Sequence, residues 1–141
     1  MYKDNKVYKK SIEFLVDKNA DKVDHSGGTF LEHLIGVAEI LEDWDCSFDT
    51  VMAGMFHNIY GNKHYDPNLN ITREEVKKLI GEKSENLAWT FKNTDREKII
   101  DLKNLDLLLI RLANEYEQNE LNFKDFNKDI KALISLMKGG V

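Results

Sequence analysis

A repeated helix-start signal and a near absence of proline constrain this chain of 141 residues more than any other feature. The pattern Thr-x-x-Glu occurs three times, at Thr29–Glu32, Thr72–Glu75 and Thr94–Glu97. In such a capping box the threonine hydroxyl accepts a hydrogen bond from the third helical amide, and the glutamate reaches back to the threonine amide. Because Pro67 is the only proline, long stretches are free to be helical. The sequence therefore predicts an all-α fold.

The apolar spacing and the cap residues place the expected helices. Ser47 is a further N-cap candidate, and Gly81 ends a helix. In the first helix we expect Val7, Ile12, Leu15 and Val16 to be buried. No segment has the alternation and composition of a strand. The predicted helices cover 4–18, 30–44, 48–58, 73–80, 84–92, 105–118 and 125–138, with a loop of about a dozen residues after the third.

Length and composition favour one soluble helical domain over residues 1–141. Hydrophobic residues make up 42% and charged residues 32% of the chain, which is ordinary for a globular protein. No apolar run approaches the roughly 20 residues that span a bilayer, and the N-terminus shows no secretory signal. The only cysteine, Cys46, excludes an internal disulfide, so we expect a cytoplasmic location without membrane association. The net charge of −5 and the lack of a basic stripe argue against nucleic acid as a partner.

Two histidines are expected to meet. His33 lies near the start of the helix at 30–44, and His57 closes the helix at 48–58. Their connection, 45–47, is short, so the helices should pack antiparallel. Small residues at Ala53 and Gly54 would allow close approach. The imidazoles then either fill the core as hydrogen-bonded side chains or line one pocket as metal ligands.

The residues around these histidines resemble a known family. His33-Leu34-Ile35-Gly36-Val37-Ala38-Glu39-Ile40-Leu41 and Ala53-Gly54-Met55-Phe56-His57-Asn58 are similar to the paired histidine motifs of the HD-domain superfamily of metal-dependent phosphohydrolases. Ser26-Gly27 resembles its guanosine-tetraphosphate hydrolase branch. The segments 25–29, 56–61 and 113–118 are similar to a small HD-like subgroup with Asn or Ser after the second histidine. The resemblance covers roughly residues 20–118, and it implies a compact HD-like helix bundle.

The resemblance implies a metal site that has lost its acids. His33 and His57 match the family's histidine ligands, and Asn58 stands in place of its metal-binding aspartate. Gly61 and Asn62 replace a Glu-Asp pair of the hydrolase branch. In the stretch Ile110-Arg111-Leu112-Ala113-Asn114, the last metal aspartate is replaced by Ile110. Asp101 or Asp106 could supply a substitute carboxylate, although an acid beside an apolar segment is more often exposed or capping.

Four further residues are expected at a ligand pocket, each beside an alternative. By the resemblance, His25 stands where the hydrolase branch places a basic nucleotide contact, although the adjacent Gly27-Gly28 could simply form a turn. Tyr60 would reach the ligand or pack as an aromatic side chain. Arg111 needs an anion, which is more often a protein carboxylate than a phosphate. Asn114 is retained from the family stretch. The other prominent side chains are expected in the core or pocket wall (Trp44, Met52, Met55, Trp89 and Phe91) or in solvent (His64).

These observations predict a protein that binds a small phosphorylated or nucleotide-like ligand near two histidines and is catalytically weak or degenerate. A divalent ion (Zn, Ni, Mn or Fe) would bind modestly, because nitrogen ligands suit zinc and nickel better than Mg²⁺. An active metal-dependent phosphohydrolase is one alternative. A structural or partner-binding helical protein that forms a homo-oligomer is another.

Overall fold

The computed structural model describes residues 2–25, 27–62, 64–120 and 123–139, and in the last helix the side chains of 127–129 and 131–136. The α-helices are α1 (Lys6–Asp17), α2 (Phe30–Asp43), α3 (Phe48–Met55), α4 (Arg73–Ile80), α5 (Glu82–Lys92), α6 (Leu105–Glu117) and α7 (Phe123–Gly139). Short 3₁₀ helices cover Tyr2–Asp4, Ala20–Lys22 and Arg96–Leu102 (η1, η2 and η3). The all-α prediction is confirmed. One feature was not predicted, an antiparallel pair of two-residue strands, β1 (Asp24–His25) and β2 (Gly28–Thr29).

Two of the three predicted capping boxes form. Thr29 at α2 and Thr72 at α4 each accept from the third helical amide, and the matching glutamate accepts from the threonine amide. Ser47 caps α3 as predicted. The Thr94 box is wrong: the Thr94 hydroxyl donates to the Thr90 carbonyl at 2.7 Å. That bond ties Thr94 to the end of α5, so η3 begins after Asp95 without a side-chain cap.

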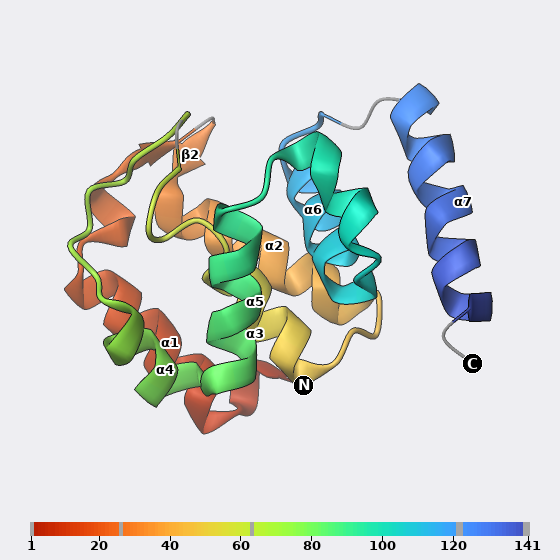
Figure 1. Ribbon diagram of the computed structural model, residues 1–141. Coiled ribbons are helices and arrows are strands. Elements are labelled where there is room, and N and C mark those ends of the chain that lie inside the picture. Colours follow the sequence, from red (N-terminus) through yellow and green to blue (C-terminus); the bar gives the residue numbers. More distant parts are fainter. Residues whose placement is uncertain (1, 26, 63, 121–122, 140–141) are drawn as a thin grey trace.

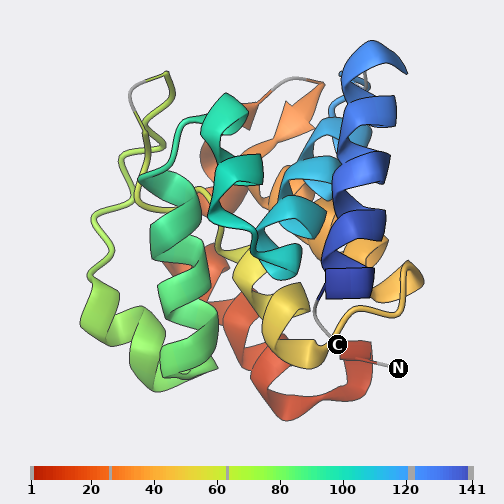
Figure 2. The same ribbon diagram turned by 45° about the vertical axis from the view of Figure 1, so that its right-hand side comes forward.

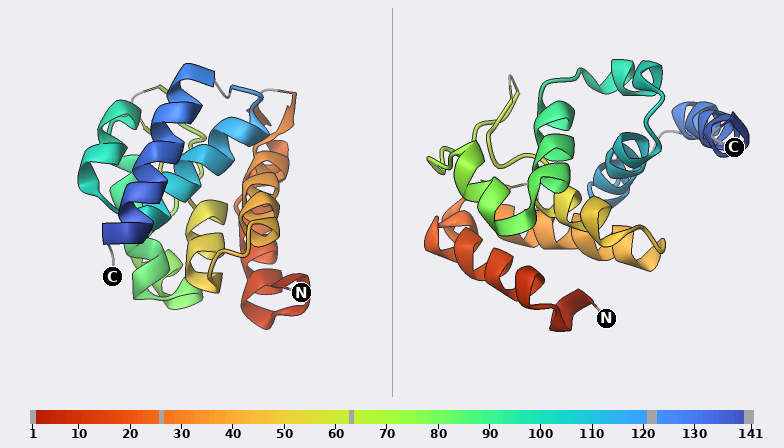
Figure 3. Two further views of the ribbon diagram at one scale, coloured as in Figure 1. Left: turned by 90° about the vertical axis from the view of Figure 1, so that its right-hand side faces the viewer. Right: turned by 60° about the horizontal axis from the view of Figure 1, so that its bottom comes forward.

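The antiparallel pair α2 and α3 forms the centre of the molecule (Figure 1). α6 packs on both of these helices, and α5 packs on α3. α1 and α4 pack on each other at the opposite side from α6 (Figures 1 and 3). α7 runs along α6 at the edge of the molecule (Figures 2 and 3). Of the described helices, none is long and apolar enough to cross a membrane.

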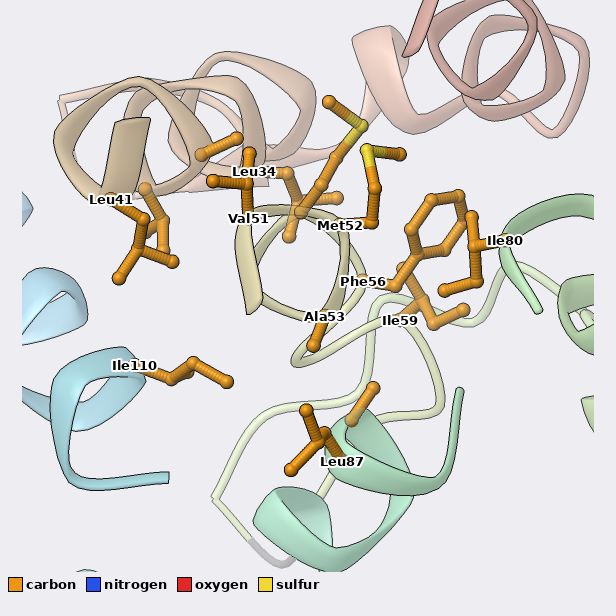
Figure 4. Packing of buried hydrophobic residues seen from close by; sticks show 14 of the residues in the cluster. Leu34, Leu41, Val51, Met52, Ala53, Phe56, Ile59, Ile80, Leu87 and Ile110 are labelled. Atoms are coloured by element: carbon orange, nitrogen blue, oxygen red, sulfur yellow. The ribbon is translucent and has the colours of Figure 1, made fainter. Parts of the chain in front are cut away.

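The core surrounds α3, and Figure 4 shows Leu41 of α2, Leu87 of α5 and Ile110 of α6 around it. Full burial of each large apolar side chain contributes about 1.5–3 kcal/mol. The predicted close approach of α2 and α3 is confirmed. A Cβ atom on Gly54 would lie 2.3 Å from Leu41 Cδ1 and 3.3 Å from Val37 Cγ1. Glycine at this position therefore sets how near the two helices can come.

Three predictions about individual positions are wrong. Val16 is 41% exposed, whereas Leu15 is buried as predicted, together with Tyr8 and Ser11. Val7 and Ile12 are partly buried against the core. Ser11 tolerates burial because its hydroxyl donates to the Val7 carbonyl at 2.7 Å. Trp44 is 41% exposed at the end of α2. His57 does not close α3, which ends at Met55, but lies in the turn that follows.

Candidate functional site

A cavity of about 870 Å³ lies at one end of the α2–α3 pair. Its walls come from β1, the segment after α3, the end of α5 with the start of η3, and the last turn of α6. In Figure 1 the β1–β2 hairpin, the segment that leads from α3 to α4, and the end of α6 lie at this same end. A cavity of this size matches the range of small-molecule sites.

The predicted convergence of His33 and His57 is confirmed. Both side chains are buried, both line the cavity, and their ring centroids lie 5.2 Å apart. His25 stacks on His33, with centroids 4.2 Å apart and an angle of 12° between the rings. Phe91, predicted as core or pocket wall, meets His57 edge-on at 5.5 Å. Antiparallel packing brings these rings together from positions far apart in sequence.

The hydrogen bonds of His57 define its tautomer. Nδ1 lies 2.6 Å from the Gly54 carbonyl oxygen, which can only accept, so Nδ1 carries the proton. Nε2 lies 3.1 Å from Asn114 Oδ1. In the neutral ring Nε2 is a lone pair and has no proton for this oxygen, so the two atoms face each other as two acceptors, as two ligands of one cation would.

All three clustered histidines are neutral near pH 7. Burial lowers the pKa of His57 to about 3, and the charge of His33 would lower it further. Burial likewise lowers the pKa of His33 to about 4, with His25 as the second cause. Burial also lowers the pKa of His25. A hydrogen bond with Asn114 raises the pKa of His33 and His57, but less than burial lowers it. Neutral imidazole is the form that binds a metal ion.

The sequence did not identify Glu117 as part of this site. Its Oε1 lies 2.5 Å from His33 Nδ1, and Gln118 Nε2 donates to the same oxygen at 2.5 Å. A negative carboxylate at this distance favours the protonated ring and so acts to raise the His33 pKa. It also accepts a hydrogen bond from Nδ1–H of the neutral ring. The nearest acid to the histidines is therefore Glu117 in the last turn of α6.

The expected ligand-pocket residues divide into two groups. His25, Tyr60 and Asn114 line the cavity, although the Tyr60 hydroxyl is already bound to Glu85 at 2.9 Å. Arg111 does not line it. Its guanidinium lies 3.0 Å from Glu115 and 3.6 Å from Asp129, so the carboxylate alternative is the correct one. Arg111 points from α6 toward α7 because those acids lie on that side.

The expected metal positions also need correction. Asn58 lines the cavity, and its Oδ1 accepts from Asn62 at 2.9 Å. Ile110 does not face the histidines but lies in the core, and Asn114, one helical turn later, takes that place. Asp106 accepts from Thr50 at the start of α6, and Asp101 is exposed on η3. Neither of these acids lines the cavity, so neither replaces the missing carboxylates.

The donor set fits only a modest, nitrogen-rich metal site. Within the described part of the chain, no group of three or more His, Cys, Asp or Glu is arranged to hold a metal ion. The donors at hand are Nε2 of His33 and His57 and the amide of Asn114. The 3.1 Å between His57 and Asn114 matches the separation of about 3.0–3.4 Å between two ligands of one ion bound at 2.1 Å. Such a set suits zinc or nickel and does not suit Mg²⁺.

Several cavity residues gave no sequence signal. Tyr65, Lys92, Arg96 and Gln118 line the cavity, but their types and spacing match surface positions equally well. Glu117 follows Asn114 by three residues, which places both on one face of α6. That spacing could have indicated Glu117 once Asn114 was placed beside a histidine.

The chain was also compared with known proteins. The model of a family described as a domain of unknown function (DUF6817) matches residues 14–96. No curated protein matches the chain, and no solved structure matches it. The matched residues include His25, His33 and His57, whereas the α6 part of the site lies beyond them. Because the match covers more than half of the chain, this protein belongs to the DUF6817 family.

Proposed function

We propose that the cavity binds a small phosphorylated or nucleotide-like ligand beside His33 and His57, with little or no catalysis. The observation that carries this proposal is the meeting of two neutral, buried imidazoles at a cavity large enough for such a ligand. A cavity of this size lies in the range of small-molecule sites, which favours a ligand role for these histidines over core filling alone. The resemblance of their motifs to the HD-domain superfamily supports the same class of ligand.

The charges around the cavity determine what a phosphate would need in order to bind there. Among the described residues, two basic side chains, Lys92 and Arg96, line it together with four acids, Asp66, Asp95, Glu97 and Glu120. Arg96 is partly neutralised, since it lies 3.2 Å from Glu120. A phosphate would meet more negative than positive charge here, so it needs a cation as a partner. We propose that a divalent ion bound by the Nε2 atoms of His33 and His57 supplies that charge.

The missing carboxylates explain why we propose binding rather than efficient hydrolysis. A metal-activated hydroxide requires a firmly held ion that lowers the pKa of its water. Two imidazoles and an amide leave the charge of the ion unneutralised and hold it weakly. Asn58, in the place of a metal-binding aspartate, is a neutral side chain. The HD-like site would therefore retain its shape and lose most of its activity.

Calorimetry tests this proposal with defined probes. Chelator-free protein is titrated with Ni²⁺ or Zn²⁺ and then, in the presence of the ion, with inorganic phosphate and a nucleoside monophosphate. We expect modest metal binding and phosphate binding that depends on the metal. His57→Asn keeps a donor for the Gly54 carbonyl but removes the Nε2 lone pair, so it should abolish both. Phosphate binding that is equal in the variant, or absent from the metal-loaded parent, would contradict the proposal.

A further inference from the structure

The contact between Glu117 and His33 joins the last turn of α6 to the first turn of α2. Oε1 of Glu117, the last residue of α6, lies 2.5 Å from Nδ1 of His33 in the first turn of α2. An ionised carboxylate has no proton to donate, and a neutral imidazole carries one proton on one of its two nitrogens. The contact is therefore a hydrogen bond only when that proton lies on Nδ1. His33 Nε2 then keeps its lone pair.

The surroundings of Glu117 hold its carboxylate in place. Gly36 lies one turn after His33, and a Cβ atom there would lie 3.0 Å from Glu117 Cγ and 3.3 Å from Oε2. Any larger residue at position 36 would push the glutamate side chain away. On another side, Gln118 Nε2 donates to Oε1 at 2.5 Å and also lies 3.1 Å from His33 Nδ1. A carboxylate oxygen cannot donate to Nδ1, so the shorter contact with Glu117 requires the proton on Nδ1, and the Gln118 amide hydrogen goes to Oε1. The carboxylate thus approaches His33 through space that glycine leaves open, and an amide hydrogen bond orients it.

His57 carries its ring proton on the same nitrogen as His33 but donates it to a different kind of acceptor. Its Nδ1–H donates to the Gly54 carbonyl at 2.6 Å, which also leaves Nε2 as the lone pair. In proteins, a histidine that binds a metal commonly donates its other ring N–H to a carboxylate or a backbone carbonyl. Here Nδ1–H of His33 donates to a carboxylate, and Nδ1–H of His57 donates to a backbone carbonyl. For His57 the acceptor is local backbone, three residues away, whereas for His33 it comes from α6.

We infer that Glu117 is a positioning residue: it holds the proton of His33 on Nδ1 and thereby presents the Nε2 lone pair to the cavity. This inference rests on the proposed function for its purpose, since it prepares His33 as a ligand donor. It gives α6 a role beyond packing. The residue that sets the state of His33 lies outside the segment 14–96 that the DUF6817 family model matches.

Nuclear magnetic resonance of protein labelled with ¹⁵N at histidine tests the inference directly. The ring nitrogen shifts of a neutral histidine report which nitrogen carries the proton. In metal-free protein at neutral pH we expect His33 to be protonated on Nδ1. In Glu117→Leu the acceptor is gone, so the proton should move substantially to Nε2 and the affinity for Ni²⁺ should fall about tenfold or more. Glu117→Gln keeps an acceptor oxygen and should restore much of the Nδ1 form.

A matched control removes a carboxylate that lines the cavity and is not bound to His33. Glu120→Leu deletes the partner of Arg96 and should leave the His33 tautomer unchanged. An Nε2–H tautomer of His33 in the parent protein would overturn the inference even if no variant folds. An unchanged tautomer in a folded Glu117→Leu protein would overturn it as well. Failure of the proposed function looks different, because the tautomers would be as expected while neither metal nor phosphate binds.

Discussion

Two buried polar clusters in this protein lie on either side of Tyr60 and differ in how their hydrogen bonds are satisfied. In the first, the Glu85 carboxylate is fully buried, accepts two bonds from Arg73 at 2.8 Å, and accepts one from the Tyr60 hydroxyl at 2.9 Å. In the second, Nδ1 of His33 and of His57 has a partner within the protein, and both rings line a cavity.

Burial acts differently on the ionisable groups of the two clusters. Burial raises the pKa of Glu85, but hydrogen bonds from Arg73 and Tyr60 outweigh burial and hold it below its usual value. That cluster is charged and internally complete. At the histidines burial dominates, and the pKa values of both rings fall. The rings of that cluster are neutral, and both line the cavity.

Acidification from pH 7 to pH 5 should destabilise the protein through the histidines rather than through Glu85. The unfolded histidines titrate near 6.5, whereas the folded rings have pKa values of about 4 and about 3. Below pH 6.5 the unfolded state therefore binds more protons, and stability falls until the folded values are reached. Two such groups would lower the free energy of unfolding by about 4 kcal/mol between pH 7 and pH 5. Glu85, with its lowered pKa, stays ionised over this range.

Urea unfolding at both pH values measures this loss. His57→Asn removes one of the two titrating groups and keeps a hydrogen-bond donor toward Gly54. The loss should fall to about half in this variant. If the parent and the variant lose stability equally between pH 7 and pH 5, His57 is not a buried neutral imidazole.

Arg73→Met should lower the free energy of unfolding by about 3 kcal/mol at pH 7. The substitution removes both hydrogen bonds from Arg73 to the buried Glu85 carboxylate and leaves the one from the Tyr60 hydroxyl. A buried charge without its charged partner is strongly destabilising. The partial exposure of Arg73 places the expected loss at the lower end of that range. Lys83→Met is the control, since its ion pair with Asp49 is 3.7 Å long and solvent-exposed, and it should change stability by less than about 0.5 kcal/mol. Equal effects of the two substitutions would contradict the difference between the clusters.

Gly54→Ala should lower stability by about 1 kcal/mol. The new Cβ would meet Leu41 at 2.3 Å, and overpacking costs about 1–3 kcal/mol. Alanine recovers up to about 1 kcal/mol of helix propensity. The same change separates α2 from α3, so the rise in melting temperature on addition of Ni²⁺ should also shrink. A more stable variant would mean that Leu41 rotates away and that this contact does not set the helix spacing.

Asn58→Asp should leave stability without metal almost unchanged and strengthen the response to divalent ions. The carboxylate keeps the acceptor for Asn62 and adds a negative ligand beside His57. A tenfold gain in affinity would raise the melting temperature in excess metal on the order of 4 °C above the parent. Asn5→Asp, at the N-cap of α1, adds the same charge far from the cavity and should give the response of the parent. Lowered stability with an unchanged metal response would identify Asn58 as a structural amide.

Local sequence signals predicted the helical fold well because they depend on residues close together in the chain. The capping boxes at Thr29 and Thr72 and the cap at Ser47 form as expected. Thr94 failed, although its pattern is the same, because its hydroxyl bonds to the preceding helix instead. The short connection between α2 and α3 was enough to predict that His33 and His57 meet.

The rest of the site depended on how distant helices pack. The sequence determined the helices, the small residues between α2 and α3, and the pairing of two histidines, since each follows from spacing along one or two neighbouring elements. Three features became known from the packing of the helices: Asn114 rather than Ile110 faces His57, Arg111 turns toward α7, and Glu117 reaches His33 beside Gly36. Those choices follow from the rotation and crossing of α6 over α2, which the amphipathic pattern of an almost wholly buried helix does not encode.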